Sequence, residues 1–367
     1  MPKVVITGGG TGGHLYPMLS IADALVKAGV ALSDIRLIGS SRGEDQRILA
    51  SCPYRVSYWP GRGIRRSLSP RDIAANLRAL AGISWAFALG IVTAVVWRPS
   101  VVVSVGGYAS LPMSIGAVLT RRTLVLVELD ARAGLAQRLV KRFAAARCTS
   151  FADSDPRAVL TGVPLRSGLS LTTEERRQVA KASLLPEISP ARKVVLVMTG
   201  SLGAKRVNDA VAELAEIWAD RTDLALVQIT GRRDFARVKA REVRGTLDYR
   251  IIEFADMTKF WPIADVAICR AGATTVAELG VVAVPAVLVP LPNSPSDHQN
   301  ENARALVAEG AARVIDDSKV SGMTLAKMLE SILDTTTLGS MAEAMRKRGR
   351  PNAAADIAKI VIESSGQ

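Results

Sequence analysis

A glycine-rich stretch near the amino terminus ends on one of only two histidines in the chain. In VVITGGGTGGHLYPM, residues 4–18, five glycines occupy six positions and His14 follows directly. Glycine lets a backbone come close to an oxygen-rich ligand, and the first amides of a following helix favour anions. A neutral imidazole at that point is able to take a proton from a hydroxyl group at neutral pH. The stretch therefore predicts either general-base catalysis by His14 or a histidine that caps the helix.

The same loop satisfies the GxGxxG pattern of dinucleotide-binding proteins through Gly8, Gly10 and Gly13. A dinucleotide site needs an acidic residue after the second strand for the ribose, and this chain has Gly39 and Ser40 there. No Lys-Ser or Lys-Thr pair follows the loop, as a nucleoside-triphosphatase would require. The spacing thus favours a bare backbone loop for an oxygen-rich ligand over an NAD-dependent dehydrogenase.

A second candidate anion site lies in CRAGATTVAELG, residues 269–280, where a strand leads into a helix near Gly272. The positive end of the helix dipole favours a diphosphate at this point. Thr275 and Glu278 are three residues apart, so they share one helix face. Glu278 is therefore suited to accept both hydroxyls of a ribose, although an ordinary solvated glutamate has the same pattern.

Two further groups of polar residues have open interpretations. His298, Gln299 and Asn302 form a cluster that suits either sugar hydroxyls or loop capping. Asp153 and Asp155 form an Asp-x-Asp triplet of the kind that binds metals in some transferases. Because a proline follows the triplet outside the glycine motifs, we interpret it as a turn and expect no obligatory metal.

The elements that must position these residues follow a regular alternation. Short β-branched runs alternate with helical patterns, which predicts parallel sheets built from βαβ units. One series contains KVVIT, IRLIG, VVVSV and TLVLVEL, and a second contains KVVLVMT, LALVQIT, YRIIEF, VAICR and PAVLVPL. Gly, Pro, Ser and Thr cluster between the two series, at residues 161–175. We therefore expect two Rossmann-like α/β domains, residues 1–163 and 164–340, and a final helix at about residues 341–365 that packs back on the first.

Charge and composition limit the classes of partner. Lys and Arg exceed Asp and Glu by 13, which favours anionic partners. Aromatic residues make up only 4%, and no stretch alternates aromatic with basic residues, as a surface that binds single-stranded nucleic acid would. Nucleic acid is therefore not an expected partner. The amino terminus lacks the pattern of a signal peptide, which predicts a protein that stays in the cytoplasm. Three separated cysteines, Cys52, Cys148 and Cys269, predict buried thiols rather than disulfides or a zinc site.

A stretch of 19 residues without a charge, residues 79–97, has three possible interpretations. Hydropathy alone predicts a membrane-spanning helix. Gly82, Ser84 and Gly90 interrupt the stretch, and it lies within an otherwise folded α/β pattern. A core helix and a membrane-docking face are therefore the alternatives.

Six motifs together resemble the MurG family, the bacterial N-acetylglucosaminyltransferases that make lipid II. They are GGTGGHLYP, SVGGYASLP, TGSLGAKRVN, CRAGATTVAELG, VPAVLVPLP and DHQNENARAL, in this order, and the similarity extends from residue 3 to about residue 360. The resemblance implies the GT-B fold, two Rossmann-like domains facing each other across a cleft. It also implies inverting transfer of N-acetylglucosamine from UDP to the 4-hydroxyl of the muramoyl sugar of lipid I, without a cofactor.

The resemblance further implies roles for individual residues. In loops that face the acceptor or the donor it places Thr11, Gly12, Gly13, Gly106, Gly107 and Tyr108. On the donor side it places Arg166, Ser201, Gly203, Thr275, Glu278 and Gln299. His14 becomes the candidate base or its partner, and Arg166 alternatively fixes the hinge.

One segment departs from the family pattern. Members usually carry His-Glu-Gln-Asn after the fourth strand, and this chain has Val127, Glu128, Leu129 and Asp130. Glu128 is retained, whereas Asp130 replaces an amide and is an alternative base. The catalytic candidates are thus His14, Glu128 and Asp130. A related glycosyltransferase that acts on another lipid, such as a diacylglycerol, is the alternative function.

A polyprenyl acceptor implies a peripheral position on the inner face of the cytoplasmic membrane, where cell-wall synthesis proteins are possible partners. The predicted contact is apolar surface within residues 77–97, rimmed by Arg62, Arg65, Arg66 and Arg71. Each basic residue near an anionic leaflet contributes about 1 kcal/mol, which makes an anionic membrane surface the expected partner.

Overall fold

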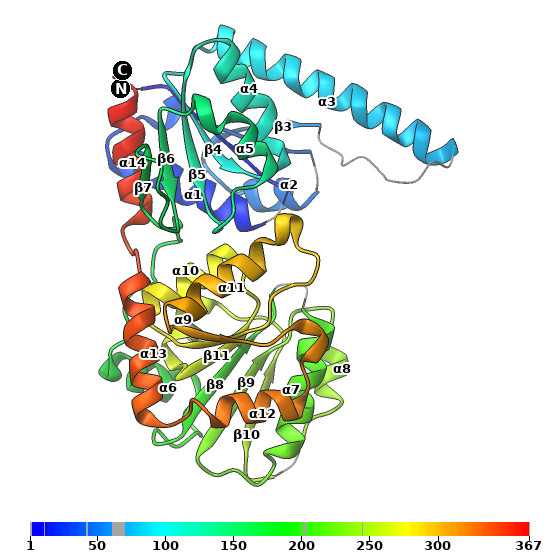
Figure 1. Ribbon diagram of the computed structural model, residues 1–367, viewed down its shortest axis with the longest axis vertical. Coiled ribbons are helices and arrows are strands. Elements are labelled where there is room, and N and C mark those ends of the chain that lie inside the picture. The colour runs from blue at the N-terminus through cyan, green and yellow to red at the C-terminus, as the bar shows by residue number, and fades with distance from the viewer. Residues whose placement is uncertain are drawn as a thin grey trace. The chain divides into compact units, whose positions relative to one another are not determined.

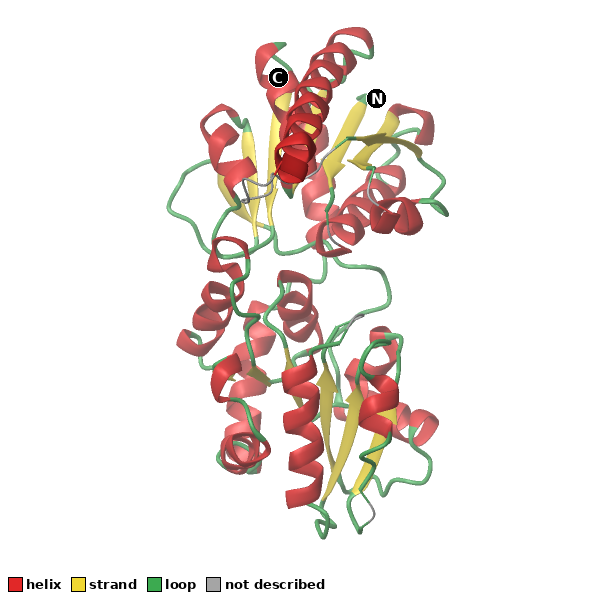
Figure 2. Ribbon diagram, turned by 90° about the vertical axis from the view of Figure 1, so that its right-hand side faces the viewer, coloured by secondary structure: helices red, strands yellow, loops and turns green. Residues whose placement is uncertain are grey.

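The computed structural model describes residues 2–10, 12–41, 43–60, 70–200, 203–243 and 245–366, without the side chains of residues 43–44 and 70–80. Its contacts divide the chain into two compact units. Unit 1 consists of residues 1–167 and 351–367, and unit 2 of residues 168–350. Each unit holds one parallel sheet with helices around it (Figures 1 and 2). The predicted α/β class with two parallel sheets is confirmed.

The sheet of unit 1 has seven parallel strands in the order β3-β2-β1-β4-β5-β6-β7. The strands are β1 (Val4–Gly8), β2 (Ile35–Ser40), β3 (Arg55–Trp59), β4 (Val101–Gly106), β5 (Thr123–Glu128), β6 (Ala146–Thr149) and β7 (Ala158–Leu160). The helices are α1 (Gly12–Lys27), α2 (Gly43–Leu49), α3 (Pro70–Val96), α4 (Leu111–Leu119), α5 (Leu135–Val140) and α14 (Ala353–Ser364). Both β1 and β4 are buried at every residue, as expected for valine-rich strands covered on both faces of a parallel sheet.

The sheet of unit 2 has six parallel strands in the order β10-β9-β8-β11-β12-β13. The strands are β8 (Lys193–Met198), β9 (Leu224–Ile229), β10 (Asp248–Ile252), β11 (Val266–Cys269), β12 (Ala286–Leu288) and β13 (Ala312–Val314). The helices are α6 (Glu174–Leu184), α7 (Lys205–Ile217), α8 (Phe235–Lys239), α9 (Met257–Phe260), α10 (Ala273–Val282), α11 (His298–Ala308), α12 (Gly322–Glu330) and α13 (Thr335–Arg348). Two of the expected buried thiols, Cys148 and Cys269, are buried, whereas Cys52 is half-buried.

The strand order indicates where each unit binds ligands. In unit 1 the chain leaves the centre of the sheet in opposite directions from β1 and β4, and in unit 2 it does so from β8 and β11. In open parallel sheets, ligands bind beyond the carboxyl ends of the strands at this reversal of strand order. The loops after β1, β4, β8 and β11 are therefore placed to bind ligands.

The uncharged stretch at residues 79–97 belongs to the long helix α3, which extends beyond the sheet of unit 1 (Figure 1). Ala86 and Ala94 are buried, and a Cβ at Gly90 would lie 2.3 Å from the carbonyl oxygen of Pro112 in α4. These small residues let α3 and α4 pack closely, while the opposite face of α3 exposes apolar side chains. Among the described residues, no helix is both long enough and apolar enough to span a bilayer.

The single helix expected at the carboxyl end is instead two helices, α13 and α14. Gly349 has an extended conformation, and a Cβ there would lie 2.5 Å from the carbonyl oxygen of Gly280. Pro351 then prevents the helix from continuing through this segment. As a result α13 belongs to unit 2, whereas α14 packs on α1 in unit 1.

Candidate functional site

The glycine loop of unit 1 is fastened by a carboxylate from α2. Asp45 is fully buried, and its two oxygens accept the N–H of Gly10 at 3.2 Å each, while Oδ2 also accepts the N–H of Ser40 at 2.8 Å. A Cβ at Gly9 would lie 2.3 Å from Oδ2 of Asp45, which explains the glycine at that position. The Gly10 amide is therefore already bonded within the protein, which argues against a dinucleotide diphosphate bound through it.

The loops after β1 and β4 pack against each other, and the half-buried His14 lies against the second of them. A Cβ at Gly107 would lie 2.2 Å from the carbonyl oxygen of Gly9, and one at Gly10 would lie 2.6 Å from the ring of Tyr108. A Cβ at Gly106 would be 3.4 Å from Nε2 of His14, so the imidazole lies directly against this turn. The structure thus brings together His14 and the predicted loop residues 106–108 in unit 1.

Gln137 of α5 joins this group, although no motif in the sequence points to it. Its side-chain amide is buried and donates to the carbonyl oxygen of Val127 at 2.7 Å. A Cβ at Gly106 would lie 3.4 Å from its Cδ. Gln137 therefore links the end of β5 to the turn on which His14 rests. A single glutamine in a short helix has no distinctive spacing, so only the structure identifies it.

Glu128, at the end of β5, forms a bidentate ion pair with a buried arginine. Arg147 of β6 is 0% exposed and Glu128 is 5% exposed. The Nε of Arg147 donates to Oε1 of Glu128 at 2.8 Å, and Nη2 donates to Oε2 at 2.7 Å. These bonds raise the pKa of the Arg147 guanidinium. Arg147 thus engages both carboxylate oxygens of Glu128, which favours a structural role for this residue over proton transfer.

The Asp-x-Asp triplet surrounds the other side of the same arginine. Asp153 Oδ2 lies 2.6 Å from Nη2 of Arg147, and Asp155 Oδ2 lies 3.1 Å from Nη1. The hydrogen bond from Arg147 lowers the pKa of Asp153, and hydrogen bonds from Arg157 lower that of Asp155 to about 2. Both carboxylates are thus bound to arginines. Among the described residues there is also no group of three or more side chains able to hold a metal ion.

In unit 2, the loops after β8 and β9 are in close contact. A Cβ at Gly203 would lie 2.5 Å from the carbonyl oxygen of Thr230, and one at Gly231 would lie 2.4 Å from the nitrogen of Gly203. Beneath them the fully buried Asn208 donates to the carbonyl oxygen of Thr230 and to Asp234, both at 2.9 Å. A rigid polar network therefore supports the loop that contains Gly203.

The helix α10 begins beside this loop, at the carboxyl end of β11, and carries the predicted nucleoside residues. Its N-cap is Gly272, and Thr275 and Glu278 are both half-buried. The indole Nε1 of the buried Trp261 donates to Oε2 of Glu278 at 2.9 Å. Glu278 is thus held by a specific partner, unlike an ordinary solvated helix glutamate.

Two side chains of the polar cluster at residues 298–302 fasten neighbouring loops. Oε1 of Gln299 accepts the N–H of Leu291 at 2.9 Å, which joins the preceding loop to α11. Asn302 is fully buried and donates to the carbonyl oxygen of Ala271 at 3.0 Å, next to the start of α10. The loop-capping interpretation thus has a specific contact for each residue, and sugar binding by Gln299 stays a prediction.

Two of the predicted site residues, Thr11 and Ser201, lie outside the described residues. A third, Arg166, contacts the helix α1. The guanidinium of Arg166 lies over the ring of Tyr16 in α1, 3.3 Å from its centroid. Because Tyr16 and Arg166 both belong to unit 1, this contact ties the hinge segment to the helix that carries His14.

An exposed aromatic residue at the ligand-binding edge of unit 2 had no role in the sequence analysis. Phe254 follows β10 and is 58% exposed, and the guanidinium of Arg232 lies 5.5 Å from its ring centroid. A flat, exposed ring at this edge is suited to stacking on a nucleobase. The sequence analysis includes this phenylalanine in the expected strand YRIIEF, whereas β10 ends at Ile252, two residues before it.

Comparison with known proteins gives one consistent result. Models of the glycosyltransferase family 28 N-terminal and C-terminal domains match residues 4–149 and 194–360. A UDP-N-acetylglucosamine--N-acetylmuramyl-(pentapeptide) pyrophosphoryl-undecaprenol N-acetylglucosamine transferase from Alkalilimnicola ehrlichii is 36% identical, over 99% of each chain. The enzyme of the same name from Halothermothrix orenii is 31% identical, over 95% of each. The crystal structure of Acinetobacter baumannii MurG superimposes with a TM-score of 0.81 and 26% identity, covering 99% of this chain and 100% of that one.

Proposed function

The chain belongs to the MurG family of glycosyltransferases and has its GT-B fold, and from this premise we propose that it converts lipid I to lipid II. In this reaction N-acetylglucosamine passes from UDP to the 4-hydroxyl of the muramoyl sugar of undecaprenyl-diphospho-muramoyl-pentapeptide. The observation that carries the proposal is the match to transferases of that name along nearly the whole chain. The matched region includes the ligand-binding edges of both units.

Unit 1 would bind the acceptor, with His14 as the general base. The imidazole lies against the turn at Gly106, between two glycine loops that allow a sugar and a diphosphate to come close. An inverting transfer needs a base within hydrogen-bond reach of the attacking hydroxyl, and a half-buried imidazole at neutral pH meets that need. The oxygen then attacks the anomeric carbon as its proton passes to His14.

Among the three catalytic candidates, the ion pair of Glu128 with Arg147 gives that carboxylate a supporting role. Asp130 lies two residues further along and is partly exposed, so it is the second candidate for contact with the acceptor sugar. Its charge replaces a neutral amide of the family pattern, which also makes it the residue to test for an altered acceptor.

Unit 2 would bind the donor at the carboxyl edge of its sheet. The first amides of α10 point toward a diphosphate there and stabilise the charge that develops on departing UDP. Glu278 would accept the ribose hydroxyls, with Thr275 on the same helix face, while Ser201 and Gly203 would lie near the diphosphate and Gln299 near the sugar. Arg166, from the hinge, remains a proposed donor residue.

The proposal is tested with radiolabelled UDP-N-acetylglucosamine and two acceptors supplied separately. We expect label to enter a short-chain lipid I analogue and not a diacylglycerol. Transfer to the diacylglycerol alone would establish the alternative, a related glycosyltransferase for another lipid. Release of free sugar with neither acceptor labelled would refute both.

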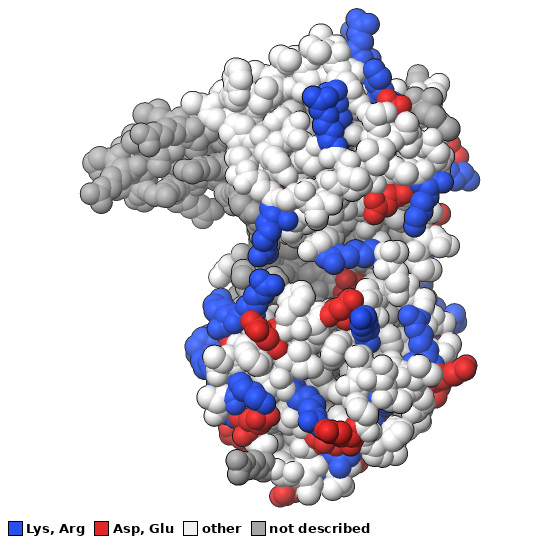
Figure 3. All heavy atoms as spheres, turned by 180° about the vertical axis from the view of Figure 1, so that it is seen from behind, with Lys and Arg blue, Asp and Glu red and all other residues white. Residues whose placement is uncertain are grey.

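We also propose that unit 1 docks peripherally on an anionic membrane. On the face seen in Figure 3, Lys and Arg are scattered, several beside acidic residues, so net charge alone marks no site. Exposed apolar side chains lie together on the helices α3 and α4, although water disfavours such surface. They are Trp85, Val92, Val95 and Val96 of α3 and Leu119 of α4. Of the predicted arginine rim, Arg62, Arg65 and Arg66 and the side chain of Arg71 lie outside the described residues.

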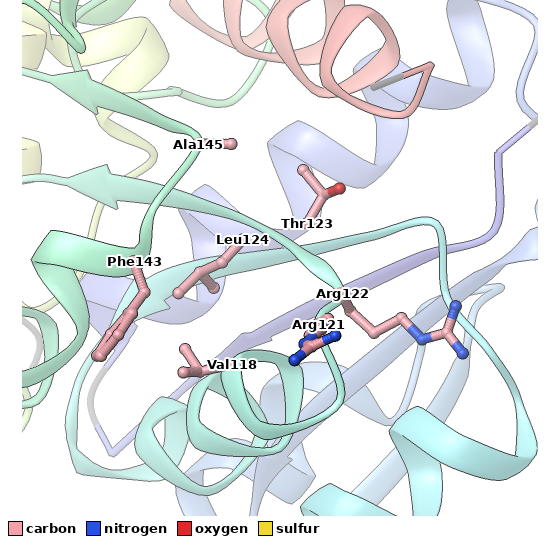
Figure 4. Close-up of a pocket in the computed structure, with 7 residues that line it drawn as sticks. All are labelled: Val118, Arg121, Arg122, Thr123, Leu124, Phe143 and Ala145. Atoms are coloured by element: carbon pink, nitrogen blue, oxygen red, sulfur yellow. The ribbon is translucent and has the colours of Figure 1, made fainter.

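A pocket of about 340 Å³ adjoins the end of α4 and combines both kinds of contact (Figure 4). Val118, Leu124 and Phe143 lie on one side, and Arg121 and Arg122 on the other. Neither arginine has a carboxylate partner among the described residues. Two unpaired cations beside an apolar wall suit the phosphate and upper acyl chain of an anionic lipid.

Sedimentation with phospholipid vesicles tests the docking. Binding is expected to rise with anionic lipid content and fall with salt, since the attraction fades within a Debye length. Arg121→Gln combined with Arg122→Gln should weaken it, whereas the control pair Arg304→Gln and Lys327→Gln, on exposed helix faces of unit 2, should not. Equal loss in both pairs would show a diffuse charge effect and no docking site.

A further inference from the structure

We infer that Trp261 is a positioning residue that holds the carboxylate of Glu278 in place for the ribose hydroxyls of the donor nucleotide. This inference rests on the proposed role of Glu278 in binding that ribose. It assigns a function to a buried tryptophan that lies outside every glycine motif of the chain. Two observations support it, the hydrogen bond between the two side chains and the close packing of the buried segment that contains the tryptophan.

The indole lies in a buried and well-packed segment. Trp261 is 0% exposed and begins the short helical turn η4 (Trp261–Ile263), whose three residues are all buried. The next polar residue, Asp265, forms ion pairs with Arg177 and with Lys181, the latter at 3.1 Å. Both partners lie on α6, which packs against η4. From this segment the N–H of Trp261 donates to Oε2 of Glu278 at 2.9 Å.

A fixed donor matters because a glutamate side chain has several rotamers. Ordering one such side chain at a binding interface costs about 0.5–1.5 kcal/mol, and that cost is removed when the protein orders it beforehand. An ionised carboxylate has about four acceptor positions, and the single N–H of an indole occupies only one of them.

The nature of the donor is equally important. An indole N–H is neutral and offers a single hydrogen, so it orients the carboxylate without neutralising its charge. Glu128 in unit 1 shows the opposite arrangement, because Arg147 engages both of its oxygens. The bond from the indole to Glu278 thus differs in kind from the bidentate ion pair of Glu128.

The test compares Trp261→Phe with a matched control in the same unit. Trp218 is also buried, and its Nε1 has no hydrogen-bond partner among the residues that the structure describes, so Trp218→Phe makes the same change in size without removing a described hydrogen bond. Titration calorimetry with UDP should show a roughly 2- to 12-fold higher Kd for Trp261→Phe, the fold-change equivalent of ordering one side chain. Trp218→Phe should leave the Kd unchanged.

Two further measurements separate positioning from general loss of structure. With 2′,3′-dideoxy-UDP, Trp261→Phe should bind as the unmodified protein does, because no ribose hydroxyl is left to meet Glu278. In a Glu278→Ala background, Trp261→Phe should have no further effect on UDP binding. In nitrogen-edited NMR spectra, the indole resonance that Trp261→Phe removes should shift on addition of UDP and not of the dideoxy analogue.

The outcomes distinguish the inference from its premise. If Glu278→Ala leaves UDP binding unchanged, the ribose role fails and the inference fails with it. If Glu278→Ala weakens binding and Trp261→Phe does not, the inference alone is overturned. It is also overturned if Trp261→Phe weakens UDP and its dideoxy analogue equally, since the tryptophan would then only support the fold.

Discussion

Replacing Arg147 with methionine tests whether Glu128 supports the structure or performs the chemistry. The change removes two hydrogen bonds of 2.8 and 2.7 Å and leaves a carboxylate that is 5% exposed without its buried partner. Breaking a buried ion pair from one side costs about 3–5 kcal/mol. The contacts of Arg147 with Asp153 and Asp155 lie nearer the surface and add at most about 1 kcal/mol each. We therefore expect a loss of at least about 3 kcal/mol in the stability of unit 1.

The loss is measured as urea unfolding together with hydrogen exchange of peptides from β5 and β6. Arg157→Met is the control, because Arg157 is 40% exposed and its bond to Asp155 should be worth no more than about 1 kcal/mol. Replacing both Arg147 and Glu128, with methionine and leucine, should recover most of the loss, since apolar pairs often substitute for buried ion pairs. A cost below about 1 kcal/mol for Arg147→Met would refute the structural role. So would a fall in kcat of about 100-fold in the folded double variant, the scale for losing a general base.

The remaining predictions concern the acceptor side of unit 1. His14→Ala should lower kcat by roughly 100-fold or more with little change in the Kd for UDP, and near-normal turnover would assign the proton transfer elsewhere. Asp130→Asn should leave rate and pH profile nearly unchanged if the residue only bonds to sugar hydroxyls, whereas slower turnover with a displaced acidic limb would indicate a share in the base role. Asp45→Asn should cost about 1–3 kcal/mol in thermal unfolding, because it leaves a buried backbone N–H poorly paired, and a silent variant would contradict that loop contact. Arginine partners lower the pKa of Asp153, and they lower that of Asp155 to about 2. The stability that these two carboxylates contribute to the fold is therefore complete above their pKa in the unfolded chain, which is about 4, and it is lost as the pH falls toward 2. Circular dichroism should show acid unfolding in that range, and a loss that begins near pH 6 would require other groups.

The sequence was sufficient wherever the signal was local. Valine-rich runs predicted buried parallel strands, and glycine turns before helices predicted the loops that surround His14 and Gly203. Each of these signals lies within about ten residues, and backbone geometry alone requires glycine at several of the positions. The MurG resemblance then depended on the order of these local motifs along the chain.

The long-range partnerships had no such signal. Arg147 is one arginine among many, and it becomes the centre of an ion network only because β5, β6 and the following turn meet around it. Asp45 reaches the glycine loop across 35 residues of sequence, and Trp261 reaches Glu278 across 17. Burial in these cases results from packing of the whole unit, which a single sequence does not display.

The break between α13 and α14 is a different kind of error. Gly349 and Pro351 are ordinary signals of a helix end, and they were present in RKRGRPN. The prediction of one final helix across this segment did not take them into account. The structure shows that close approach of Gly349 to Gly280 fixes the break.

Analysis of the disaccharide product tests the central claim most directly. The protein would be incubated with UDP-N-acetylglucosamine and a soluble lipid I analogue, and the product examined by mass spectrometry and NMR. We predict one added N-acetylglucosamine, joined to the 4-oxygen of the muramoyl sugar, with the anomeric configuration inverted relative to the donor. A retained configuration, another attachment point or no disaccharide at all would contradict the proposed function.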